Sequence, residues 1–253
     1  MALGPVFLML LGAFGTSAWS AEPPPPPWIA ETWACTYNGD NDMDDVLRAR
    51  DYMVSQADKA DLALADAYIW SLAKGNIPVE TVWFTIHENF MAYTANSDAW
   101  VASGIGPGVL ERFDAVSNCA TGLATMRPVF GREGALPEDD TPTLIASQSC
   151  RFVNGAGPGH LADLASHTRD VMTVMGDNAP GFAAVMEPFT ARPAGSPEVF
   201  MFSVFNNATE WGNYVNALFS TDAGQMLRNH QAMVVDCDLT VWSGMQVVQA
   251  AGD

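Results

Sequence analysis

The chain has 253 residues, of which 49% are hydrophobic and 16% charged, and its 29 acidic and 11 basic residues give a formal net charge of −18. This length accommodates two domains of about 100 residues each, and the hydrophobic content excludes a disordered chain. So acidic a surface repels phosphate backbones and anionic lipid headgroups, which argues against nucleic-acid binding and peripheral membrane binding.

The first twenty residues have the pattern of a signal peptide. Val6 to Ala13 is an apolar run too short to span a bilayer, and Ala18-Trp19-Ser20 fits the small-x-small pattern that precedes cleavage. Pro23 to Pro27 follow and predict a stiff, extended spacer within residues 21–31. We therefore expect an exported protein, secreted or periplasmic, without a membrane anchor after cleavage.

The remainder of the chain contains an internal duplication. Similar segments recur in the same order: Cys35-Thr36-Tyr37 with Cys150-Arg151-Phe152, residues 80–89 with residues 198–207, and Cys119 with Cys237. Ordered matches along a whole unit indicate two copies of one fold. We predict a first repeat over residues 32–130, a linker over 131–145 and a second repeat over 146–250.

Each repeat is predicted to run strand, helix, strand, strand, helix, strand. In the first repeat we expect strands at 32–37, 65–72, 81–89 and 119–129, and helical segments at 45–59 and 92–116, the second of them broken near the glycines of 104–108. The helix 45–59 has a counterpart at 161–175. This βαββαβ order is the ferredoxin-like arrangement, in which both helices cover one face of an antiparallel sheet.

Two such copies in one chain can shield their open faces by packing sheet against sheet. In this duplicated order, and in the junctions Phe84-x-x-x-x-Asn89-x-x-x-Tyr93 and Phe202-x-x-x-x-Asn207-x-x-x-Trp211, the sequence resembles the dimeric α/β-barrel superfamily in its tandem, single-chain form. The fold class that the resemblance implies is α+β: two ferredoxin-like repeats whose sheets pack face to face as a pseudo-twofold α/β barrel. The superfamily includes cofactor-free monooxygenases and haem proteins. For an enzyme, the resemblance implies cofactor-free oxygenation or isomerisation.

The third strand of each repeat predicts where a ligand binds, because successive residues of a strand point to opposite faces. We expect the wholly apolar set to pack under the helices and the mixed set to line a cavity between the sheets. The apolar set is Val82, Phe84, Ile86, Phe200, Phe202 and Val204. The mixed set is Trp83, Thr85, His87, Asn89, Met201, Ser203, Phe205 and Asn207. A lining of apolar walls with a few polar groups is typical of small-molecule sites.

Two polar residues of this region occur in one copy only. His87 aligns with Phe205, and Arg151 aligns with Thr36. We predict His87 as the catalytic residue, a proton-transfer group or, alternatively, a metal ligand, because imidazole titrates near neutrality. Arg151 is a candidate for holding an anionic part of the ligand. The expected partner is a small, largely apolar molecule.

The sequence indicates no resident cofactor or metal. It lacks the close Cys and His spacings of a zinc site and the common hydrolase, kinase and dinucleotide motifs. The resemblance to haem members of the superfamily keeps haem as an alternative, with His160, His167 or His230 as an axial ligand. A further alternative is a non-catalytic exported protein in which side chains fill the space between the sheets.

Four cysteines remain in a chain that we expect to be exported, so disulfides are predicted. Their recurrence with the repeats favours one bond inside each repeat, Cys35–Cys119 and Cys150–Cys237. The symmetric pairs between repeats, Cys35–Cys237 and Cys119–Cys150, are the alternative.

Overall fold

The computed structural model describes residues 27–132, 141–189 and 196–250, so the expected signal peptide lies outside the described residues. The first repeat contains β1 (Trp28–Tyr37), α1 (Met43–Lys59), β2 (Asp66–Lys74), β3 (Thr81–His87), α2 (Phe90–Ser103), α3 (Gly106–Val116) and β4 (Ser117–Gly131). The second contains β5 (Thr143–Phe152), η1 (Pro158–His160), α4 (Leu161–Met175), η2 (Gly176–Asn178), β6 (Phe182–Pro188), β7 (Val199–Phe205), α5 (Ala208–Ser220), α6 (Asp222–Val234) and β8 (Val235–Val248). None of the helices in these described ranges is long and apolar enough to cross a membrane.

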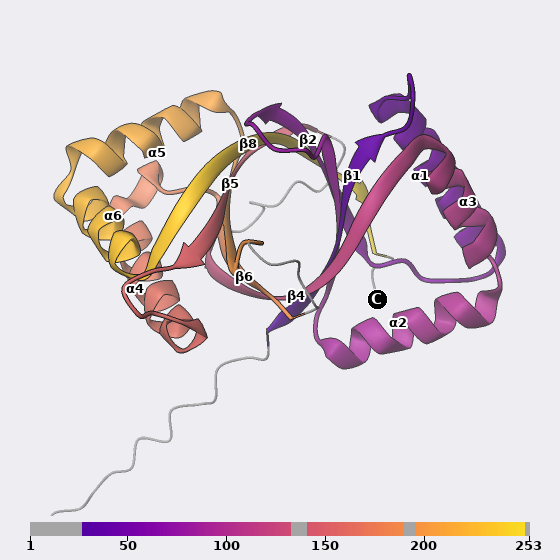
Figure 1. The fold of residues 1–253 in the computed structure, drawn as a ribbon, viewed down its shortest axis with the longest axis horizontal. Coiled ribbons are helices and arrows are strands. Elements are labelled where there is room, and N and C mark those ends of the chain that lie inside the picture. The colour runs from indigo at the N-terminus through magenta and orange to yellow at the C-terminus, as the bar shows by residue number, and fades with distance from the viewer. Residues whose placement is uncertain (1–26, 133–140, 190–195, 251–253) are drawn as a thin grey trace, which may run out of the picture.

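The eight strands form a closed antiparallel barrel in the order β1-β3-β2-β8-β5-β7-β6-β4. Within each repeat the first strand lies between the third and fourth, which is the ferredoxin-like order. The two sheets join where β2 pairs with β8 and where β4 pairs with β6. Figure 1 looks along the barrel and shows α1, α2 and α3 on one side of it and α4, α5 and α6 on the other. The predicted tandem α/β barrel is confirmed.

Aromatic side chains from both sheets fill the inside of the barrel. The Trp70 ring lies 5.2 Å from those of Phe84 and Phe202, and the latter two are 6.0 Å apart. The same buried cluster contains Ala30, Tyr68, Ala124, Met126, Ile145, Phe182, Ala184, Met186, Val204 and Trp242. The void among these side chains is about 20 Å³, room for about one water molecule. The prediction of a ligand cavity between the two sheets is therefore wrong.

The predicted faces of the third strands are reversed in the structure. The apolar set points into the barrel, where Val82, Phe84, Ile86, Phe200, Phe202 and Val204 all belong to or pack against the central cluster. Trp83 instead lies with Val46 beneath the helices of the first repeat, and Met201 lies with Leu164 beneath those of the second. The reason is that the two sheets bury the space between them, so the third strands turn their side chains without polar atoms toward it.

The helical layers of the two repeats differ in how tightly they cover their sheets. In the second repeat Leu164 of α4 and Leu227 of α6 are fully buried, and the α5–α6 contact is so close that a side chain at Gly224 would meet the backbone of Leu218. In the first repeat none of the residues of α2 is buried. The sheet of the first repeat is therefore less completely covered than that of the second.

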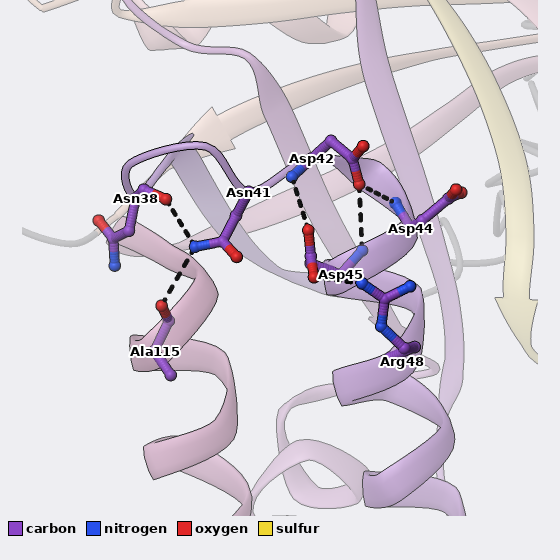
Figure 2. Close-up of polar contacts among 7 residues, drawn as sticks. All are labelled: Asn38, Asn41, Asp42, Asp44, Asp45, Arg48 and Ala115. Carbon is purple, nitrogen blue, oxygen red and sulfur yellow. Dashed lines mark hydrogen bonds and ion pairs between the residues drawn. The ribbon is translucent and has the colours of Figure 1, made fainter.

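The loop before α1 holds α1 and α3 in place. Figure 2 shows the capping box: the Asp42 carboxylate accepts from the Asp45 backbone N–H (3.3 Å), while the Asp42 N–H donates to the Asp45 carboxylate (3.1 Å). The Asn41 side-chain amide donates to the carbonyls of Asn38 (2.5 Å) and Ala115 (3.4 Å). Because Ala115 is in the last turn of α3, these bonds satisfy a helix-end carbonyl and attach α3 to the start of α1.

Both disulfides lie inside a repeat, as Cys35–Cys119 and Cys150–Cys237. In each, the two Cα atoms are 4.1 Å apart and the cysteines face each other across neighbouring strands. Antiparallel pairing places the end of β1 beside the start of β4, which brings Cys35 to Cys119. The pairing within repeats is the one that the structure contains, and the pairing between repeats is excluded.

Candidate functional site

A cavity of about 350 Å³ lies between the sheet of the first repeat and its helices, within the usual size of small-molecule sites. Its aromatic lining consists of Trp33, Trp83, Trp100 and Phe113. Its polar lining consists of Glu31, Thr81, Thr85, His87, Asn96, Ser97, Asp114 and Ser117. Residues of α1, α2 and α3 form the wall opposite the sheet. The cavity therefore lies where these helices do not pack directly against the sheet.

The pairing of β1 with β3 brings the site residues of the sheet onto one face. Trp33 lies opposite Trp83, and Glu31 lies opposite Thr85. His87 is two residues beyond Thr85 and shares its face, which makes it a diagonal neighbour of Glu31, at a backbone separation of about 7–8 Å. These five residues thus present two indoles, a hydroxyl, a carboxyl and an imidazole to the same cavity.

His87 is a buried titratable group of the site and is only 7% exposed. Its ring meets that of Tyr93 on α2 edge to face, with the ring centres 5.3 Å apart. Burial lowers the pKa of His87 from the usual 6.5, because desolvation disfavours the charged imidazolium. At neutral pH the side chain is therefore a neutral imidazole, able to accept a proton.

Glu31 is a carboxyl group enclosed by the cavity wall. Burial raises its pKa above the usual 4.5, while hydrogen bonds from Thr85 and Trp33 act in the opposite direction. The Thr85 hydroxyl donates to the carboxylate at 3.4 Å. Both partners are donors, so they stabilise the ionised form, and the cost that remains is the loss of solvent around the charge.

Thr81 supplies a polar atom without a partner. It is 2% exposed and lines the cavity, and among the described residues its hydroxyl oxygen meets no hydrogen-bonding group. The other small polar groups of the wall do have partners: Ser97 donates to the Tyr93 carbonyl (2.9 Å) and Asn96 to the Ala63 carbonyl (3.1 Å). An unpaired buried hydroxyl costs about 1–3 kcal/mol, which a ligand with a polar group would recover.

The rim of the cavity lies on α2 and α3. Val101 near the end of α2 is 79% exposed, and Leu110 and Asp114 of α3 are exposed as well. Gly104, with φ of +70°, ends α2 in the left-handed conformation that glycine adopts most easily. The chain can therefore reverse between the two helices that form the rim.

The structure brings together only part of the predicted site. Trp83, Thr85 and His87 line the cavity, on the helix side of the sheet rather than inside the barrel. Asn89 accepts from the Ala92 N–H (3.0 Å) and caps α2, and Asn207 caps α5 in the same way. These two asparagines are helix caps and lie outside the cavity lining.

The other predicted residues belong to the second repeat. Met201 and Phe205 are buried under its helices, where Phe205 packs against Tyr214 with ring centres 5.3 Å apart. Ser203 shares their face of β7 and is half-buried. Arg151 is exposed on β5 opposite Asp236, so it lies away from the cavity, and the prediction that it contacts the ligand there is wrong.

Sequence reasoning missed Glu31 and Trp33 on β1, and Trp100 on α2. The predicted first strand began at Thr32, whereas β1 begins at Trp28, which left Glu31 outside the expected sheet. The sequence nevertheless contains a signal for Glu31. When the repeats are aligned at Cys35 and Cys150, the polar Glu31 corresponds to the apolar Ala146.

The remaining histidines lie in the second repeat, away from the cavity. His160 is exposed at η1, and the rings of His167 on α4 and His230 on α6 lie 4.1 Å apart. In the part of the chain that the structure describes, no group of three or more His, Cys, Asp or Glu side chains is placed to hold a metal ion.

Comparison with known proteins identifies the fold. No protein-family model and no curated protein matches the sequence. Two solved bacterial structures, each named "putative monooxygenase", superpose with a TM-score of 0.56. The one from Lactobacillus acidophilus is 10% identical, over 89% of this chain and 96% of its own. The one from Fusobacterium nucleatum is 8% identical, over 90% and 96%. The chain has the dimeric α/β-barrel fold.

These comparisons correct one expectation from the sequence. The solved structures with this fold also include a dye-decolorizing peroxidase from Bacteroides thetaiotaomicron (TM-score 0.48, 7% identity, covering 88% of this chain and 94% of that one). A protein named "putative chlorite dismutase" is another (TM-score 0.48, 9% identity, covering 88% of this chain and 96% of that one). Solved proteins named as a peroxidase and as a chlorite dismutase share this fold, so the prediction of no cofactor, which rested on missing sequence motifs, is wrong.

The cavity residues themselves do not fit a haem. A haem carries two carboxylates, which cationic side chains stabilise most strongly, and no Lys or Arg is among the described residues that line the cavity. The charged side chains that do line it, Glu31 and Asp114, are acidic and would repel those carboxylates. The lining of this cavity therefore does not suit a bound haem.

Proposed function

We propose that the protein binds a small, largely apolar molecule in the cavity between the first sheet and helices α1 to α3, and that His87 exchanges a proton with it. The observation that carries this proposal is the cavity of about 350 Å³ with His87 buried in its wall. The fold shared with two proteins named as monooxygenases supports a small-molecule ligand, and export is part of the same proposal, supported by two disulfides.

The chemistry follows from the state of His87. A buried neutral imidazole accepts a proton from a ligand O–H or from a C–H next to a carbonyl, and the apolar wall keeps competing water away. Tyr93 packs against the ring and fixes its orientation. Thr81 can donate to a ligand oxygen and so orient the molecule. These residues bind the ligand, position it and move one proton.

A blocking substitution tests the binding part. Ser97 lines the cavity from α2, whereas Ala95 on the same helix is exposed and is not part of the lining. With 4-tert-butylphenol as probe in isothermal titration calorimetry, the wild type and Ala95→Trp should bind and Ser97→Trp should not. Equal binding by all three proteins would place the bound probe outside this cavity and contradict the proposal.

A further inference from the structure

The charges around the cavity are all of one sign. Glu31 lies in its wall and Asp114 at its rim, and the described lining contains no Lys or Arg. The neighbouring basic side chains are engaged elsewhere: Arg50 pairs with Asp51 and bonds to a main-chain carbonyl, and Arg112 lies over the Tyr52 ring. An anionic ligand would therefore enter a site with two negative groups and no counter-charge.

A neutral ligand would bury the carboxylate of Glu31 without a counter-charge. When it fills the cavity it removes the remaining solvent from Glu31. Among the described residues, the carboxylate then has only the hydroxyl of Thr85 and the indole of Trp33 as partners. Burying a carboxylate without a counter-charge is costly, and the group then tends to take up a proton. A ligand with a positive charge supplies the missing partner and keeps Glu31 ionised.

The rest of the wall suits a cation as well. The indoles of Trp33, Trp83 and Trp100 line the same space, and tryptophan is the aromatic side chain that attracts cations most strongly. An organic cation bears its charge on an apolar body, so it meets both the aromatic wall and the carboxylate. The net charge of −18 raises the concentration of cations near the surface.

We infer that the ligand of this cavity is a hydrophobic organic cation, an amine or quaternary ammonium compound, held between the three indoles and the carboxylate of Glu31. This inference rests on the proposed function, since it names the ligand class of the same site. It assigns Glu31 as the residue that selects for charge. His87, neutral at the same pH, adds no repulsion to the bound cation.

The test compares two probes of equal shape: (4-hydroxyphenyl)trimethylammonium and 4-tert-butylphenol, which differ in one charge. Isothermal titration calorimetry at low ionic strength and neutral pH should show the cation binding the wild type roughly tenfold more tightly than its neutral analogue. In Glu31→Gln the ratio of the two dissociation constants should fall to about one. Glu111→Gln, which removes the same charge from the exposed face of α3, should keep the ratio of the wild type.

A pH series on the wild type gives an independent measurement should Glu31→Gln fail to fold. Because burial raises the pKa of Glu31, acidification neutralises it, and the cation should lose its advantage as the pH falls. His87 lines the same cavity, and its protonation would also repel the cation. The series is therefore repeated in His87→Ala, in which the loss of the cation's advantage on acidification should persist if Glu31 causes it.

The outcomes separate the two proposals. Equal binding of both probes to the wild type, or a preference that survives in Glu31→Gln, overturns the cation assignment and leaves the cavity as a site for neutral molecules. If neither probe binds the wild type, the assignment fails together with the proposed function.

Discussion

Replacing Phe84 by alanine should destabilise the protein more than replacing its neighbour Trp83, although tryptophan is the larger side chain. The two residues are adjacent on β3 and point to opposite faces. Phe84 is 2% exposed inside the barrel, whereas Trp83 is half-buried in the wall of the cavity. The comparison therefore measures which face of the sheet is the packed core.

The structure sets the two magnitudes. Phe84 stacks on Trp70 at 5.2 Å and meets Phe202 edge to face at 6.0 Å, and phenylalanine-to-alanine changes in such cores cost about 3–5 kcal/mol of unfolding free energy. Among the described residues Trp83 has one such ring contact, with Phe113 at 5.6 Å, and it already borders the cavity. Its loss should cost about 1–2 kcal/mol, from partial burial and one aromatic pair.

Urea unfolding followed by far-ultraviolet circular dichroism measures both values without relying on tryptophan fluorescence. The dependence of the free energy on urea should be unchanged, so that a shift in midpoint reports stability alone. Trp83→Ala should also weaken the binding of 4-tert-butylphenol, and Phe84→Ala should not as long as the protein is folded. A cost for Trp83→Ala equal to or above that of Phe84→Ala would refute the assignment of the two faces.

Four further outcomes are expected. His87→Ala should leave the unfolding midpoint nearly unchanged and weaken 4-tert-butylphenol binding by roughly tenfold, the loss of about one hydrogen bond; strong unfolding with unchanged affinity would count against its role. Glu31→Gln should raise the free energy of unfolding at neutral pH. Burial raises the pKa of Glu31 in the folded protein, so the folded state favours the protonated carboxyl. This contribution to stability is present at low pH and is lost as the pH rises through the folded pKa. The gain in unfolding free energy of Glu31→Gln over the wild type should shrink on acidification. A difference that does not depend on pH would contradict the raised pKa of Glu31. Replacing both Cys35 and Cys119 by serine opens a loop with a sequence separation of 84 and should cost about 4–5 kcal/mol in the loop-entropy model, measured by urea unfolding. Asp42→Ala should cost about 1 kcal/mol through loss of the α1 cap, and no change would mean that the capping box is dispensable.

The elements and the fold could be predicted from the sequence because they depend on local periodicity and on the repeat. The helix expected at 161–175 is α4 with the same bounds, and the break near Gly104 separates α2 from α3. The orientation of the sheets could not be predicted in this way. Alternation along β3 shows that Trp83 and Phe84 face apart, but which of them meets the second sheet depends on contacts between repeats.

The comparison of the two repeats also predicted part of the site. His87 was found because its counterpart, Phe205, is apolar, and a comparison of copies needs no knowledge of the fold. Asn89 was misassigned, although an asparagine just before a helix is a common N-cap. Trp100 gave no signal of its own, because it reaches the cavity only through the loose packing of α2 over the sheet.

Because both repeats of the barrel belong to one chain, each can accumulate its own substitutions during evolution. A barrel built from two identical subunits repeats every substitution by symmetry, so a change that hollows one helical layer hollows the other. Here each half can change independently. The second, with Phe205 and Leu227 buried, can serve as support, which leaves the first free to keep a helical layer that covers its sheet incompletely and borders the cavity beside His87.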